Sequence, residues 1–256
     1  MKQPAAASCE DHNRLVLLHG WGFDHRVWDG MAAALQAHYQ VERPDLRMPD
    51  VKDNAISRQG SDGCKTLLAI SLKEPCVLVG WSLGGLLAIR LAKQFPATVR
   101  AVVLLASTPC FLKRPDWPYG IEPHLLSGLI DRVDRDVGAA MTFFCGLVAS
   151  GDPSPRHTLR ILRAQVVSND KDSLLHGLHV LAEEDRRADL AAITCPLALI
   201  LGSNDKLVDP AIIHEISKLR ADVHPVIMNN AGHAPFVLKQ EETVLHIQEF
   251  LHECVK

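Results

Sequence analysis

The chain has 256 residues, of which 22% are charged, and its formal net charge at pH 7 is −3. A nucleic-acid-binding domain is usually strongly basic, so this balance argues against a nucleic-acid partner. The first 13 residues contain no apolar run of signal-peptide length, and the longest apolar runs have the length of a strand. We therefore expect a soluble protein that neither crosses nor binds a membrane.

The seven cysteines are scattered along the chain, and none forms a C-x-x-C pair. This spacing argues against both a disulfide framework and a zinc site. Several of the cysteines lie in apolar segments, where a reduced thiol behaves as a small hydrophobic group. We expect a cytoplasmic protein that holds no metal.

Short apolar segments recur along the chain, and three of them end in a turn rich in glycine or polar residues. The apolar segments are residues 14–18, 76–79, 99–106, 196–201 and 223–228. Continuous apolar runs of this length are typical of strands that are buried on both faces of a parallel sheet. Helical patterns over residues 83–95 and 243–251 lie between or after them. The alternation predicts an α/β fold with a mainly parallel, doubly wound sheet.

Residues 111–190 interrupt this alternation. They begin with three prolines, Pro115, Pro118 and Pro123, and continue as charged, mostly helical sequence. We predict a helical lid of residues 111–190 over the carboxyl edge of the sheet, and a core formed by residues 1–110 and 191–256. A lid at this edge commonly shapes a substrate pocket. The alternative is a surface insertion without a role in binding.

The pentapeptide Gly80-Trp81-Ser82-Leu83-Gly84 matches G-x-S-x-G between a predicted strand and a predicted helix. A serine on such a sharp turn has strained backbone angles, and the glycines leave room for it. The turn places the hydroxyl at a helix N-terminus, where developing negative charge is favoured. Ser82 is therefore the candidate nucleophile of an α/β-hydrolase fold, and the alternative is a helix N-cap serine.

A serine hydroxyl needs a neighbouring base, and in this fold the order along the chain is serine, acid, histidine. His233 follows the last predicted strand, whereas most other histidines lie in helical or lid patterns. Asp205 ends an apolar strand at the same edge of the sheet. Asp209 competes with it, but the Asp209-Pro210 pair is typical of a helix cap. We expect Asp205 to orient His233.

An ester hydrolase also needs donors for the oxyanion that forms during the reaction. The backbone N–H of Leu83 is one candidate, and the N–H of Trp21, in the turn after the first strand, is the other. That turn could equally be a tight turn without a catalytic duty. Neither a phosphate-binding loop nor a dinucleotide-binding motif occurs, so we expect no cofactor.

Arg156, Arg160 and Arg163 recur on one face of a predicted helix inside residues 111–190. Such a face is often only solvated. Arginines in this arrangement also suit phosphates and carboxylates, so the face could bind an acidic partner.

Several segments spread over most of the chain share their motifs with one family. They are His19-Gly20-Trp21-Gly22, Gly80-Trp81-Ser82-Leu83-Gly84-Gly85-Leu86, Ser107-Thr108-Pro109-Cys110-Phe111, Asp116-Trp117-Pro118 with Gly120-Ile121, and Ala231-Gly232-His233-Ala234-Pro235-Phe236. Together they resemble the pimeloyl-[acyl-carrier protein] methyl ester esterases. The resemblance implies hydrolysis of the methyl ester of pimeloyl-acyl carrier protein in biotin biosynthesis. It also implies the triad Ser82, Asp205 and His233, with oxyanion donors at Trp21 and Leu83.

The resemblance further implies that Trp81 and Phe144 line an acyl pocket and that lid arginines hold the acidic carrier. Arg156 and Arg160 match two of those arginines, and this match favours the acidic-partner interpretation. The other two positions are occupied by Ala139 and Phe143 in this chain.

A second departure from the family lies in residues 41–75, where Arg43-Pro44-Asp45-Leu46-Arg47-Met48-Pro49 replaces a glycine-rich turn. A changed loop near a pocket mouth can alter substrate preference without touching the triad. Two alternatives therefore remain open. One is a broad carboxylesterase or thioesterase that acts on small free acyl esters, and the other is a ligand-binding protein that has lost catalysis. In each case we expect a monomer.

Overall fold

The computed structural model describes residues 14–46, 72, 74–166 and 171–254. Most of the segment that departs from the family, including Arg47, Met48 and Pro49, lies outside the described residues. Within them, none of the helices is both long and apolar enough to span a membrane.

The described strands form one six-stranded sheet in which all neighbouring pairs are parallel, in the order β2-β1-β3-β4-β5-β6. Their bounds are β1 Arg14–Leu18, β2 Gln40–Glu42, β3 Cys76–Trp81, β4 Val99–Leu105, β5 Leu197–Gly202 and β6 His224–Met228. The three central strands β1, β3 and β4 are held in register by pairs such as Leu17 with Val79 and Val79 with Val103. The predicted parallel α/β sheet is confirmed.

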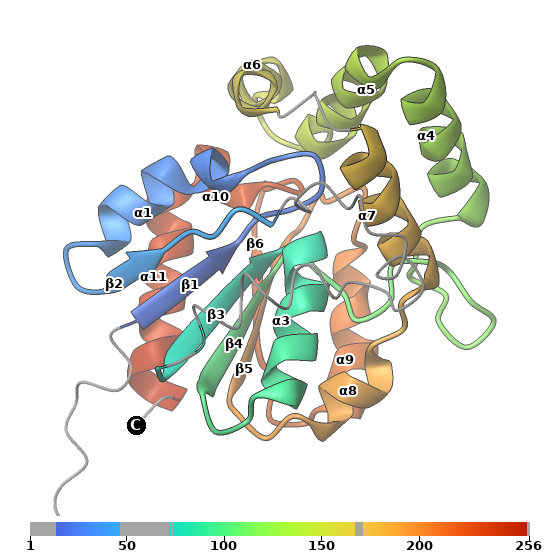
Figure 1. The fold of residues 1–256 in the computed structure, drawn as a ribbon. Helices are drawn as coiled ribbons and strands as arrows, with labels where there is room; N and C mark the ends of the chain where they lie inside the picture. Colours follow the sequence, from blue (N-terminus) through green and yellow to red (C-terminus); the bar gives the residue numbers. More distant parts are fainter. Residues whose placement is uncertain (1–13, 47–71, 73, 167–170, 255–256) are drawn as a thin grey trace, which may run out of the picture.

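Helices cover both faces of the sheet (Figure 1). One face carries α1 and α11, and the other carries α3, α8 and α9. The bounds of these and the short connecting helices are η1 His25–Trp28, α1 Asp29–Leu35, α3 Leu83–Gln94, α8 Arg187–Ala192, η2 Pro210–Ile212, α9 Ile213–Leu219, α10 Pro235–Leu238 and α11 Gln240–Cys254. Two-sided covering is what continuous apolar strands require.

Four helices lie beyond the carboxyl ends of the strands (Figure 1): α4 Pro123–Arg135, α5 Val137–Ala149, α6 Pro155–Gln165 and α7 Lys171–Glu183. Proline stands in the first turn of α4 and of α6, where it needs no partner for its nitrogen. Asp136 caps α5 by accepting a hydrogen bond from the N–H of Ala139 at 2.9 Å. The proposed boundary at residue 190 falls within α8, which packs against α3 on the sheet. The division into core and lid stays a prediction.

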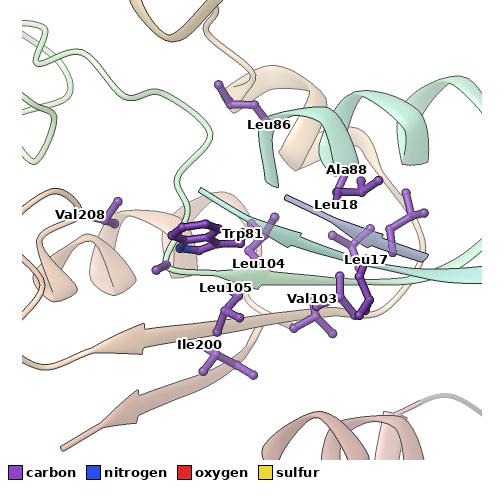
Figure 2. Close-up of a cluster of buried hydrophobic side chains, with 14 of the residues drawn as sticks. Leu17, Leu18, Trp81, Leu86, Ala88, Val103, Leu104, Leu105, Ile200 and Val208 are labelled. Atoms are coloured by element: carbon purple, nitrogen blue, oxygen red, sulfur yellow. The ribbon is translucent and has the colours of Figure 1, made fainter. Parts of the chain in front are cut away.

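The hydrophobic core lies on both sides of the central strands (Figure 2). Leu17, Val103, Leu104 and Ile200 are fully buried there between the sheet and its helices. Burying one leucine or valine side chain contributes about 1.5–3 kcal/mol to folding. The core fixes the central strands, and the ends of these strands position the residues of the candidate site.

Glycine packing at the end of β3 is a constraint that can be tested. A Cβ atom on Gly80 would clash with backbone atoms of Gly84 and Gly85 in the first turn of α3. We expect Gly80→Ala to lower the free energy of unfolding by roughly 2–3 kcal/mol in denaturant titrations, because this backbone cannot yield easily.

The control for this test is Gly128→Ala in the middle of α4, where an added Cβ meets nothing within 4 Å. That substitution should raise the free energy of unfolding by about 0.5–1 kcal/mol, because alanine favours the helix. A Gly80→Ala variant as stable as the original protein would contradict the packing argument.

Candidate functional site

Ser82 occupies the turn between β3 and α3, with φ of 54° and ψ of −119°. A positive φ is strained for any residue with a side chain. The turn is held by two hydrogen bonds: the Ser82 N–H donates to the carbonyl of Leu105 at 3.1 Å, and the Ser107 hydroxyl donates to the Ser82 carbonyl at 2.7 Å. Gly84 lies so close to the carbonyl of Leu18 that a Cβ atom would clash with it. The local sequence thus allows α3 to approach the sheet and expose the serine hydroxyl.

The structure brings Ser82, His233 and Asp205 together, although they come from three separate loops. The Nε2 atom of His233 lies 3.0 Å from the Ser82 Oγ, and its Nδ1 atom lies 2.8 Å from Asp205 Oδ2. All three residues are buried, with exposed fractions of 6%, 1% and 6% for Ser82, His233 and Asp205. With Asp205 ionised, His233 carries its proton on Nδ1 and offers Nε2 as acceptor to the hydroxyl.

The Asp205 carboxylate has a fixed orientation. Its Oδ1 atom accepts hydrogen bonds from the N–H groups of Leu207 and Val208 at 2.8 and 3.0 Å, which leaves Oδ2 for His233. The competing carboxylate, Asp209, caps η2 by accepting from the N–H of Ala211 at 2.9 Å. The helix cap predicted for Asp209 is confirmed.

The two expected oxyanion donors lie on either side of the serine turn. Leu83 is the first residue of α3, so its N–H has no partner within the helix. Trp21 precedes Gly22, whose φ of 79° suits a tight turn. Among the described turns and loops, neither amide donates to a backbone carbonyl. Their role as oxyanion donors stays a prediction.

The turn that carries Trp21 is anchored on both sides. The indole N–H of Trp21 donates to the carbonyl of Leu174 in α7 at 2.7 Å. The buried His19 ring accepts from the N–H of Leu46 through Nε2 at 2.9 Å and donates from Nδ1 to the carbonyl of Gly20, also at 2.9 Å. These contacts hold the turn after β1 in place and fix the tautomer of His19.

A cavity of about 590 Å³ opens at Ser82, and His233 also lines it. Its wall comes from α4, α5 and α7, from the segment that follows β4, and from the loop after β5, which includes Asp205 and Asp209. The apolar part of this wall includes Phe111, Leu126, Leu129, Phe144, Leu178 and Leu181. A largely apolar cavity with a few polar groups at one position is the common form of a small-molecule site.

The structure places the two expected acyl-pocket residues differently. Phe144 lines the cavity, and its ring meets Trp21 edge-on with the ring centroids 4.6 Å apart. Trp81 does not line it. The Trp81 side chain is buried (Figure 2) in an aromatic cluster with Phe23 and Phe236, whose ring centroids each lie 5.1 Å from that of Trp81. Its indole N–H donates to the carbonyl of His233 at 2.8 Å. Trp81 is the last residue of β3, and through this hydrogen bond its side chain supports the loop that carries His233.

Arg156 and Arg160 are exposed on α6 and do not line the cavity. Among the described residues no carboxylate pairs with either one, and Arg160 contacts only the ring of His157, at 3.3 Å. Ala139 and Phe143 lie on the exposed side of α5. Phe143 also lines the cavity, and the Arg132 guanidinium lies 4.4 Å from the centroid of its ring.

Sequence reasoning missed one buried carboxyl group near the triad, that of Asp152. It precedes α6 and accepts a hydrogen bond from the N–H of Gly232, the neighbour of His233, at 2.7 Å. The two residues are 80 positions apart. Its Gly151-Asp152-Pro153 setting resembles any turn, so no local pattern could have revealed the contact. Among the described residues, no group of three or more histidine, cysteine or acidic side chains could hold a metal ion.

Solved structures share this architecture at low sequence identity. The esterase from Exiguobacterium antarcticum has a TM-score of 0.80 at 20% identity, covering 94% of this chain and 92% of that one. A bromoperoxidase from Bacillus anthracis has a TM-score of 0.81 at 20% identity with the same coverage. At this identity the likeness concerns the fold alone.

The sequence comparisons identify the family as well as the fold. The model of the alpha/beta hydrolase family matches residues 15–244. The pimeloyl-[acyl-carrier protein] methyl ester esterase of Aeromonas salmonicida is 35% identical over 244 residues, or 93% of this chain and 94% of that protein. The protein of the same name from Nitrosomonas europaea is 33% identical over 90% of this chain and 92% of its own length. The resemblance indicated by the motifs is thereby confirmed, and the chain belongs to the alpha/beta hydrolase family.

Proposed function

We propose that this protein is a serine carboxylesterase that hydrolyses the methyl ester of pimeloyl-acyl carrier protein, a step of biotin biosynthesis. The observation that carries the proposal is the hydrogen-bonded line from Ser82 through His233 to Asp205 beside an apolar cavity. This arrangement has the geometry of a nucleophile, its base and the group that orients the base. The names of the full-length relatives support the choice of substrate.

In the first half of the reaction, the Nε2 atom of His233 takes the proton of the Ser82 hydroxyl as its oxygen attacks the ester carbonyl. The carbonyl oxygen becomes an oxyanion, and the N–H groups of Leu83 and Trp21 stabilise it. When the tetrahedral intermediate collapses, the ester C–O bond breaks. The imidazolium then gives its proton to the departing methoxide, and methanol leaves an acyl-enzyme on Ser82.

In the second half, His233 removes a proton from water, whose oxygen attacks the acyl carbonyl. Collapse of this intermediate returns the proton to the Ser82 oxygen and releases the carboxylic acid. Asp205 stays ionised throughout and stabilises the imidazolium through its 2.8 Å hydrogen bond. No cofactor is needed for either half.

The cavity and the surface of α6 together support a carrier-linked substrate. The cavity wall suits an aliphatic acyl chain, and Leu125 and Phe143, exposed by 57% and 40%, extend it as an apolar rim. Arg156, Arg160 and Arg163 on α6 are exposed, and none forms an ion pair with a described carboxylate. Arginines in this state are available to an acidic protein or to a phosphate.

One observation favours the broad carboxylesterase as a second candidate. Ala139 and Phe143 occupy positions on α5 where the resemblance implies arginines, and the Phe143 ring contributes to the apolar rim. An apolar rim serves a free acyl ester as well as a carrier-linked one. The ratio of kcat/KM for the two kinds of ester therefore separates the candidates.

The first prediction on this function concerns the nucleophile. We expect Ser82→Ala to lower kcat by roughly 10⁶-fold for any ester substrate, because the other groups of the triad act only through the serine. The assay compares methyl pimeloyl-acyl carrier protein with a p-nitrophenyl ester, and circular dichroism checks the fold. Appreciable residual turnover by Ser82→Ala would remove Ser82 from the mechanism.

The second prediction separates the two neighbouring carboxylates. We expect Asp205→Asn to lower kcat by about 10³–10⁴-fold without loss of fold, because its amide oxygen can still accept from Leu207 and Val208 while the histidine tautomer is wrong. The matched control is Asp209→Asn, which keeps the cap of η2 and, although Asp209 lines the cavity, should lower kcat far less than Asp205→Asn does. A reversed pattern would assign the acid role to Asp209.

The third prediction concerns the carrier. We expect Arg156→Glu combined with Arg160→Glu to raise KM for the carrier-linked ester about tenfold, a change of about 1.4 kcal/mol, and to leave KM for the free ester unchanged. The matched control is Lys93→Glu with Arg100→Glu, two exposed positions at the opposite end of the sheet. Equal effects of the α6 pair on both esters would exclude α6 as the carrier surface.

A further inference from the structure

Three segments that are distant in sequence meet behind the triad. The first is the turn between α5 and α6, which contains Gly151 and Asp152. The second is the loop after β5, where the side-chain amide of Asn204, the neighbour of Asp205, donates to the carbonyl of Gly151 at 3.2 Å. The third is the loop after β6, where the carbonyl of Ala231 accepts from the N–H of Asn204 at 2.9 Å. The α5–α6 turn therefore contacts the loops that carry both the acid and the base.

The side chain of Asp152 makes the most direct of these contacts. Its Oδ1 atom accepts from the N–H of Gly232 at 2.7 Å, and Gly232 directly precedes His233. The fit is close, since a Cβ atom on Gly232 would lie 2.8 Å from the same oxygen. This hydrogen bond therefore fixes the position of the backbone just before His233.

The environment of Asp152 penalises its charge. The residue is 7% exposed, and its Oδ2 atom is buried without a hydrogen-bond partner. Burial is the largest influence and raises the pKa of Asp152 above its ordinary value, against the lowering effect of the Thr158 hydroxyl and the Gly232 N–H. The Thr158 hydroxyl lies nearby but donates to the carbonyl of Ser154, at 3.4 Å.

A carboxyl group whose only role was to cap a helix would lie at the surface. Asp136, which caps the other end of α5, is exposed, and its carboxyl group accepts from the N–H of Ala139 in the helix that it caps. Asp152 instead reaches a loop 80 residues away at a cost in desolvation. Its buried position is explained by the loop of His233 that it holds in place, because a misplaced base lowers the reaction rate steeply.

We propose that Asp152 is a positioning residue that holds the loop of His233, through the N–H of Gly232, so that the imidazole stays in line between Ser82 and Asp205. This role rests on the proposed function of the triad. Asp152 does not line the cavity and does not touch the reacting atoms. It therefore acts on the turnover rate and not on substrate binding.

The test compares Asp152→Ala with Asp152→Asn, using a free p-nitrophenyl ester. Alanine removes the acceptor, so kcat should fall about ten- to hundredfold while KM stays unchanged. Asparagine keeps an acceptor oxygen for Gly232 and should restore most of kcat. The proton between His233 Nδ1 and Asp205 Oδ2 should give a low-field NMR signal in the original protein and in Asp152→Asn. This signal should be absent in Asp152→Ala. If Asp152→Ala does not accumulate, Asp152→Ser, whose hydroxyl is too short to reach Gly232, replaces it.

The matched control is Asp136→Ala, which removes the cap at the other end of α5 and should lower Tm without lowering kcat. Original kcat and an unchanged proton signal in Asp152→Ala would overturn the positioning role. Equal loss in Asp152→Asn and Asp152→Ala would also overturn it, because the accepted hydrogen bond would then be irrelevant. If the original protein has no Ser82-dependent turnover, the proposed function fails instead, and the NMR comparison still tests the loop geometry.

Discussion

The strained turn at Ser82 is the constraint on which the rest of the site depends. A positive φ on a serine costs of the order of 1–3 kcal/mol, and it persists only where the surroundings hold it. Here the holding groups are the carbonyl of Leu105 at the end of β4 and the hydroxyl of Ser107 just after it. Leu105 ends the strand beside β3 and Ser107 follows it directly, so this edge of the sheet keeps the turn in its strained form.

The position of the turn also determines where the other members of the triad can lie. Strands β5 and β6 run parallel to β3, so the loops after them leave the sheet at the same edge. Asp205 follows β5 and His233 follows β6, and the two side chains meet at 2.8 Å. Burial strengthens this hydrogen bond, because little water competes with it. The apolar core therefore supports the chemistry as well as the fold.

The same topology explains which parts of the site the sequence could predict. Ser82, Asp205 and His233 each follow an apolar strand at one edge, so their meeting follows from the parallel sheet alone. The position of the Trp81 side chain does not follow from the parallel sheet alone. The strand pattern fixes which face a side chain occupies only once the twist and the turn are known. The contact of Asp152 with Gly232 depends on how α5 and α6 lie over the sheet, and no periodicity in the sequence encodes that placement.

The residues proposed for the reaction and those proposed for carrier binding lie on different parts of this chain. The triad belongs to loops of the sheet, whereas Phe143, Arg156 and Arg160 lie on α5 and α6. Under the proposed function, substitutions on these helices would change carrier binding and leave the line from Ser82 to Asp205 intact. The two parts meet at the α5–α6 turn, because Asp152, just before α6, accepts a hydrogen bond from the N–H of Gly232 beside His233.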